Sequence, residues 1–161
     1  LPGPMYCWYL SNTYLDNALK VPGKLTVCGE KLDLTRIKCP VFIYGSREDH
    51  IVPIGGAYTT TQLLTGKKRF VMGASGHIAG VINPPAKQKY QHWIGGKPSG
   101  GDVDKWLAKA TEHPGSWWPD WAGWVAQHGG DKVPPRIPGK GKLKAIEDAP
   151  GAYVKMRADK S

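Results

Sequence analysis

The sequence predicts an α/β domain with parallel strands and flanking helices, and three consecutive segments carry this prediction. Residues 41–44 (VFIY) form a β-branched and aromatic run that Gly45 ends, as is typical of a strand buried on both faces. Residues 57–64 (AYTTTQLL) favour a short helix, and residues 70–72 (FVM) favour a second strand, which Gly73 ends. A strand, a helix and a strand in this order predict a βαβ unit, in which the two strands run parallel.

The segments on either side of residues 39–128 are less regular. Residues 1–38 combine aromatic side chains with a strand-like stretch at 25–29 (LTVCG) and a helix over residues 12–19, whose apolar side chains share one face. Residues 129–161 are rich in proline, glycine and lysine and lack a clear period, so we expect an extended basic tail there. The core of the domain is therefore expected over residues 39–128, and residues 1–38 should connect into it.

Two further helices are expected within the core, after the βαβ unit. Residues 102–111 predict a helix with Asp102 as its N-cap. In residues 117–127, Trp117, Trp121 and Trp124 fall on one side of a second helix. A tryptophan stripe at this spacing indicates packing rather than chemistry.

Composition narrows the classes of function. The net charge of +9 and the pI near 9.5 favour an anionic partner, but no nucleic-acid-binding motif accompanies this charge. No apolar run reaches the roughly 18–20 residues that a membrane span needs. Cys7, Cys28 and Cys39 lie in no metal-binding spacing, so we expect reduced thiols of a cytoplasmic protein and no metal site.

One ionisable residue follows each strand of the predicted βαβ unit. Asp49 lies four residues beyond Gly45, and His77 lies four residues beyond Gly73. Because parallel strands present their carboxyl ends at one edge, where α/β sheets bind ligands, we expect the two side chains to meet there. Small residues surround His77 and leave space for another molecule, and an imidazole can exchange a proton near neutral pH.

Asp49 is expected to orient the imidazole of His77 and to stabilise the imidazolium once a proton has moved. Glu48 and His50 compete with Asp49 for this role, because the direction of each side chain in the turn decides between them. An Asx-turn or a helix cap before Pro53 is the alternative role for Asp49.

A nucleophile for such a pair is not visible in the sequence. In α/β-hydrolases, the serine or cysteine that an Asp–His pair serves sits between two glycines in a sharp turn, G-x-S-x-G or its cysteine equivalent. Cys28 has Thr26 where the first glycine is needed, and Ser75 has His77 where the second is needed. Cys7 has no flanking glycine, so no cysteine of the chain is assigned as nucleophile.

Residues 44–53 (YGSREDHIVP) and 73–85 (GASGHIAGVINPP) closely resemble the carboxyl-terminal part of class I polyhydroxyalkanoate synthases, the poly(3-hydroxybutyrate) polymerases. Residues 1–10 (LPGPMYCWYL), 112–121 (EHPGSWWPDW) and 149–155 (APGAYVK) extend the resemblance over essentially the whole chain.

The resemblance implies the carboxyl-terminal portion of an α/β-hydrolase-type catalytic domain, with residues 1–38 ending a cap region. It implies a Cys–His–Asp triad in which Asp49 and His77 match the acid and the base. The family's cysteine would lie upstream of Leu1, so the chain alone is expected to be inactive.

The resemblance also implies the reaction, an acyltransferase that polymerises (R)-3-hydroxyacyl groups from coenzyme A into a polyester. His50, Ile51 and Ala79 flank the pair and are expected to line the substrate pocket. Coenzyme A enters as part of the substrate, and no separate cofactor is expected. The complete enzyme is expected to be a homodimer in the cytoplasm, associated with polyester granules. Another α/β-hydrolase, such as an esterase, and a non-catalytic granule-binding module are the alternatives.

Overall fold

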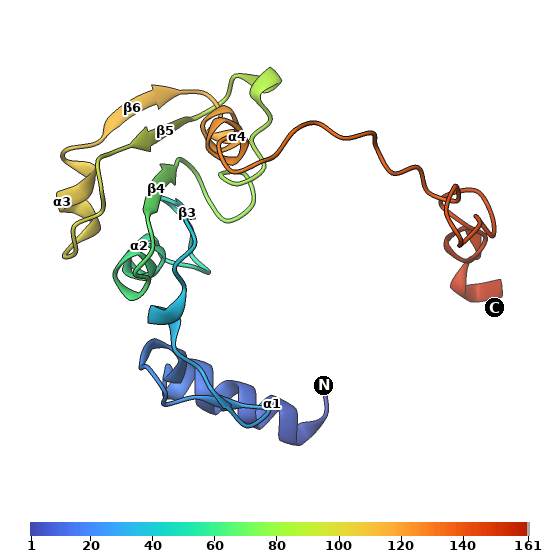
Figure 1. Ribbon diagram of the computed structural model, residues 1–161, viewed down its shortest axis with the longest axis horizontal. Helices are drawn as coiled ribbons and strands as arrows, with labels where there is room; N and C mark the ends of the chain where they lie inside the picture. Colours follow the sequence, from blue (N-terminus) through green and yellow to red (C-terminus); the bar gives the residue numbers. More distant parts are fainter. Residues whose placement is uncertain (161) are drawn as a thin grey trace. The chain divides into compact units, whose positions relative to one another are not determined.

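The computed structural model describes residues 1–160 and divides the chain into two compact units, Leu1–His128 and the residues from Gly129 onward. The first unit holds all α-helices and β-strands of the described residues (Figure 1). In chain order they are α1 (Gly3–Tyr9), β1 (Thr26–Val27), β2 (Glu30–Lys31), β3 (Val41–Ser46), α2 (Ile54–Leu63), β4 (Lys68–Gly73), β5 (Gln91–Ile94), α3 (Val103–Leu107), β6 (Thr111–Pro114) and α4 (Trp118–Ala126).

The main sheet has the strand order β3-β4-β5-β6. β3 and β4 are parallel, in register from Val41 opposite Lys68 to Ser46 opposite Gly73, so the predicted βαβ unit is confirmed. β5 pairs antiparallel with β4, and β6 pairs antiparallel with β5. The fold is therefore α/β, as predicted, with a mixed sheet whose two antiparallel strands the sequence did not indicate. β1 and β2 form a separate small hairpin.

The main hydrophobic core lies on the face of the sheet that α2 and α3 cover. Its centre is an aromatic group in which the ring of Phe70 lies 5.1 Å from that of Tyr58 and 4.7 Å from that of Trp106. Gly45 lets α2 come close, because a Cβ at this position would lie 2.6 Å from Cδ1 of Ile54. The buried apolar residues of this core are Ile43, Tyr58, Leu64, Phe70, Met72, Ala74, Trp93, Val103 and Trp106.

Trp117, just before α4, and Trp124 on α4 pack on the opposite face of β3. The ring of Phe42 lies 6.1 Å from that of Trp117 and 5.5 Å from that of Trp124. An ion pair between Arg69 on β4 and Asp120 on α4 adds a polar contact on the same face. The tryptophan stripe thus packs, as predicted, although Trp121 is 45% exposed.

The amino-terminal elements differ from the sequence prediction in their bounds. The helix expected over 12–19 begins earlier, as α1, and continues as a π-helical segment that ends at Leu15. Asn17 then adopts a left-handed conformation (φ 43°), which breaks the helix. The strand expected over 25–29 has only two residues, because Cys28 (φ 49°) and Gly29 (φ 83°) form the turn of the β1–β2 hairpin.

The expected helix over 102–111 is shorter in the structure. Asp102 caps it as predicted, since the backbone N–H of Asp104 donates to the Asp102 carboxylate at 3.0 Å. The helix ends at Leu107, and Thr111 already belongs to β6.

The second unit contains only short 3₁₀ turns among its described residues, at Tyr153–Lys155 and Ala158–Lys160. Across residues 1–160, no helix combines the length and the apolar character that crossing a bilayer requires.

Candidate active site

The loops that follow β3 and β4 run side by side at the carboxyl edge of the two parallel strands. The backbone N–H of Arg47 donates to the carbonyl of Gly73 at 2.8 Å, and that of Glu48 donates to the carbonyl of Ser75 at 3.0 Å. These bonds continue the pairing of the strands into their loops. The loop with Asp49 and the loop with His77 are thus held together by backbone.

The side chains of Asp49 and His77 meet at this edge, as the sequence predicted. Nδ1 of His77 lies 2.8 Å from Oδ2 of Asp49. An ionised carboxylate only accepts hydrogen bonds, so Nδ1 carries the proton and donates it. Nε2 of His77 then keeps its lone pair and has no hydrogen-bond partner among residues 1–160. The Asp49 side chain is 8% exposed and that of His77 is 41% exposed, so the imidazole faces outward.

The second carboxylate oxygen of Asp49 is held by backbone. The N–H groups of Ile51 and Val52 donate to Oδ1 at 2.9 Å and 2.8 Å. The Val52 N–H holds the pKa of the Asp49 carboxyl below its ordinary value, the bonds from His77 and Ile51 act in the same direction, and partial burial opposes them. The Asx-turn considered as an alternative role is therefore present together with the contact to His77.

The other predicted site residues lie around the pair without joining it. Glu48 and His50 are exposed and make no side-chain hydrogen bond to His77, so Asp49 alone among the three candidates takes this position. Ile51 contributes its backbone N–H, and the residue is 61% exposed. Ala79 is half-buried in the loop after His77. The expected role of His50, Ile51 and Ala79 in substrate binding stays a prediction.

Sequence reasoning missed the residues beneath the His77 loop. The hydroxyls of Tyr44 and Ser46 lie 3.0 Å apart on β3, and the indole Nε1 of Trp117 donates to the carbonyl of Gly80 at 3.2 Å. Tyr44 and Ser46 share one face of the strand, which their spacing of two residues could have indicated. The contact with Trp117 depends on the fold and has no local signal.

Among residues 1–160, the structure shows neither a metal site nor a cysteine beside His77. No group of three or more His, Cys, Asp or Glu side chains there is arranged to hold a metal ion. Cys7, Cys28 and Cys39 are exposed free thiols, and none of them hydrogen-bonds to His77. Among residues 1–160, the printed hydrogen-bond partner of the His77 side chain is therefore Asp49.

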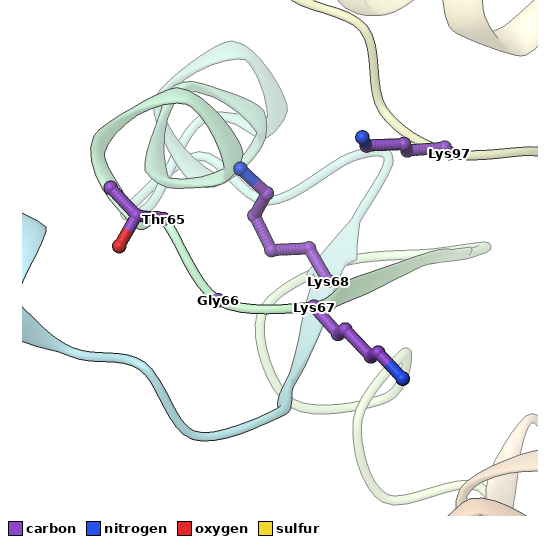
Figure 2. A pocket seen from close by; sticks show the side chains of 5 residues that line it. All are labelled: Thr65, Gly66, Lys67, Lys68 and Lys97. Atoms are coloured by element: carbon purple, nitrogen blue, oxygen red, sulfur yellow. The ribbon is translucent and has the colours of Figure 1, made fainter.

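A basic pocket of about 420 Å³ lies at the amino end of β4, at the opposite edge of the sheet from Asp49 and His77. Figure 2 shows the side chains of three lysines around it. Lys68 donates to the carbonyl of Leu64 at 2.6 Å and so caps the end of α2. The pocket residues are Thr65, Gly66, Lys67, Lys68 and Lys97.

Comparison with known proteins agrees with the resemblance. No family model matches the chain. The chain is 60% identical to the poly(3-hydroxyalkanoate) polymerase subunit PhaC of Cupriavidus necator over 160 residues, which cover 98% of this chain and 27% of that protein. The chain is homologous to a segment of the poly(3-hydroxyalkanoate) polymerases.

Other members of the poly(3-hydroxyalkanoate) polymerases match the chain over nearly its whole length. The PhaC subunit of Rhizobium meliloti is 44% identical over 98% of this chain and 25% of its own. Poly(3-hydroxyalkanoate) polymerase 1 of Ectopseudomonas oleovorans is 36% identical over 92% of this chain and 26% of its own. The chain spans about a quarter of the length of these polymerases.

Proposed function

We propose that Asp49 and His77 are the acid and the base of a polyester synthase that polymerises (R)-3-hydroxyacyl-coenzyme A with release of coenzyme A. The observation that carries this proposal is the 2.8 Å contact between His77 Nδ1 and Asp49 Oδ2, which leaves Nε2 as a free proton acceptor at the carboxyl edge of the sheet. The names of the homologous polymerases support a poly(3-hydroxyalkanoate) product, and the resemblance implies the coenzyme A thioester as the substrate.

In the proposed acylation step, Nε2 of His77 accepts the proton of a cysteine thiol other than those of Cys7, Cys28 and Cys39. The thiolate attacks the thioester carbonyl of the substrate, and the bond to the coenzyme A sulfur breaks. His77 then returns the proton to the departing thiolate, so that free coenzyme A leaves and the acyl group stays on the enzyme. Asp49 stabilises the imidazolium between these two transfers.

In the proposed elongation step, a 3-hydroxyl group attacks an enzyme-bound thioester. The hydroxyl must lose its proton as the new ester bond forms, and the cysteine sulfur must regain one. Nε2 of His77 can carry that proton from the hydroxyl to the sulfur. Asp49, which lies beside the imidazole, assists the activation of the hydroxyl. His50, Ile51 and Ala79 line the acyl pocket in this proposal.

The same proposal assigns the βαβ unit to an α/β-hydrolase-type sheet. The arrangement of Asp49 after β3 and His77 after the neighbouring parallel strand supports it, because that fold carries its triad on such loops. The net charge of +9 suits the phosphates of coenzyme A. We further propose that the complete enzyme is a homodimer in the cytoplasm and associates with polyester granules.

The test uses the protein at its natural length with (R)-3-hydroxybutyryl-coenzyme A, and it follows both free thiol and polymer. The unchanged protein should release coenzyme A and form polyester, and His77→Ala should stop both. His128→Ala, a change of the same kind at an exposed position at the end of α4, should stay active. Turnover of His77→Ala at the unchanged rate, or no release by the unchanged protein, would contradict the proposal. Release without polymer would instead favour an esterase.

A further inference from the structure

We propose that Tyr44, Ser46 and Trp117 are positioning residues that clamp the His77 loop, residues 74–80, onto the end of β3 and so set the distance between His77 and Asp49. Ser46 and Trp117 contact the loop at Gly80, and Tyr44 supports both of these side chains. The expected effect on kcat rests on the proposed function. The contacts that form the clamp do not depend on it.

Close packing between Ser46 and Gly80 is the first part of the clamp. The Ser46 side chain is buried, with 2% exposure of the residue. A Cβ at Gly80 would overlap with Oγ of Ser46 and would lie 2.5 Å from the carbonyl oxygen of Ala74. Real Cβ atoms do not approach other atoms this closely, so only glycine lets the loop rest on the strand here.

The second part is a set of side-chain contacts that closes a ring around this point. The hydroxyl of Tyr44 lies 3.0 Å from that of Ser46, and the ring of Tyr44 stacks on that of Trp117 with 4.3 Å between centroids. The indole Nε1 of Trp117 donates to the carbonyl of Gly80 at 3.2 Å. Burial raises the pKa of the Tyr44 phenol, so its hydroxyl stays protonated at neutral pH.

Gly73 completes the fit beneath the Tyr44 ring. A Cβ at Gly73 would overlap with the Tyr44 hydroxyl, so the observed position of the Tyr44 ring requires a glycine at residue 73. The structure thus has one continuous path of contact from β3 through Tyr44 and Trp117 to Gly80, and a second, direct one from Ser46 to Gly80.

The clamp stands three residues from each member of the pair, since Ser46 precedes Asp49 by three positions and Gly80 follows His77 by three. The backbone bonds from Arg47 and Glu48 hold the beginning of the His77 loop, and the clamp holds its end. Both ends of the loop are therefore tied to the chain that carries Asp49. Misplacement of a catalytic group by about 1 Å can cost roughly 100-fold in rate, so this restraint has a catalytic consequence.

The test variant is Trp117→Phe in the protein at its natural length, which keeps an aromatic ring against Tyr44 and removes the N–H that bonds to Gly80. Trp106→Phe is the matched control, because its indole also donates to a glycine carbonyl, that of Gly96 at 3.1 Å, in the core away from the pair. Tyr44→Phe is a second, milder variant that removes only the hydroxyl facing Ser46.

Two measurements separate positioning from general stability. Amide hydrogen exchange of residues 74–80, followed by mass spectrometry, reports how firmly the loop is held. Steady-state kinetics with (R)-3-hydroxybutyryl-coenzyme A reports kcat and KM separately. We expect Trp117→Phe to speed exchange in residues 74–80 and to lower kcat roughly tenfold at unchanged KM. Tyr44→Phe should act in the same direction with a smaller effect. Trp106→Phe should leave the exchange rate of residues 74–80 and kcat unchanged.

Three results would overturn the clamp. In the first, Trp117→Phe exchanges in residues 74–80 at the unchanged rate. In the second, Trp106→Phe speeds exchange there equally, so that the effect is general loosening. In the third, exchange rises while kcat stays the same, so that the loop does not position His77. If the unchanged protein shows no turnover, the proposed function fails, and the exchange comparison still decides whether the clamp exists.

Discussion

Replacing Asp49 by asparagine tests the proposed role of the pair most directly, because the change keeps the shape of the side chain and alters its hydrogen bonding. The amide oxygen can still accept the N–H groups of Ile51 and Val52, which lie 2.9 Å and 2.8 Å from Oδ1 in the structure. The amide nitrogen then faces Nδ1 of His77, where Oδ2 now lies at 2.8 Å. Since an amide nitrogen only donates, Nδ1 must accept, and the proton of the ring moves to Nε2.

The magnitude follows from this change of tautomer. With its proton on Nε2, His77 can no longer take a proton from the nucleophile, and the imidazolium also loses its carboxylate partner. The corresponding change in serine proteases lowers kcat on the order of 10⁴-fold, and we expect a loss of that order for Asp49→Asn. The fold should persist, because the two backbone bonds that hold the turn are kept.

The assay is coenzyme A release by the protein at its natural length, with circular dichroism to confirm folding. Asp102→Asn is the matched control, since Asp102 caps α3 through one oxygen and asparagine caps helices equally well. The control should retain full activity. A folded Asp49→Asn protein within tenfold of the unchanged rate would refute the role of Asp49 in setting the tautomer, whatever the role of His77.

Three further predictions concern the stability of the fold and its dependence on pH. Phe70→Ala, at a residue that is 1% exposed, should lower the free energy of unfolding by about 3–5 kcal/mol in urea titrations. Leu15→Ala, at 79% exposure, is its control and should change it by less than about 0.5 kcal/mol. Asp120→Asn should cost about 1–2 kcal/mol, because it leaves the Arg69 guanidinium without its carboxylate, and an unchanged urea midpoint would contradict this. The lowered pKa of Asp49 stabilises the protein above the unfolded value of about 3.9, and this stability is lost as the pH falls through the folded value. Thermal melting should therefore depend less on pH below about 4 in Asp49→Asn than in the unchanged protein, and equal slopes would contradict the shift.

The βαβ unit could be predicted from the sequence because each of its strands is an apolar run that a glycine ends. β5 and β6 could not, since both have four residues and contain polar side chains, such as Gln91 and Glu112. Short polar strands are stabilised by their neighbours, here β4 for β5 and β5 for β6, and their own residues carry little preference. The helix expected at 102–111 ends at Leu107, where the chain turns through i→i−3 backbone bonds before Thr111 pairs in β6.

The meeting of Asp49 and His77 could be predicted from topology alone, because both follow strands of one parallel pair. The choice among Glu48, Asp49 and His50 could not, since it depends on which side chain the turn points at the imidazole. The two roles considered for Asp49 are compatible, because its carboxylate has two oxygens. Oδ1 forms the Asx-turn, and Oδ2 contacts His77. The contact of Trp117 with Gly80 joins residues 37 positions apart and becomes visible only in the folded chain.

Backbone N–H groups make most of the hydrogen bonds that hold Asp49 and the two loops in place. Two backbone N–H groups hold one oxygen of Asp49, and two more, from Arg47 and Glu48, join the loops. We therefore expect that replacing the side chain of Glu48 leaves the pair in place, whereas a proline at position 48 would remove the N–H that donates to Ser75. Sensitivity at the site should accordingly follow backbone geometry and the space at Gly80, and Glu48→Ala should be active where Glu48→Pro is not.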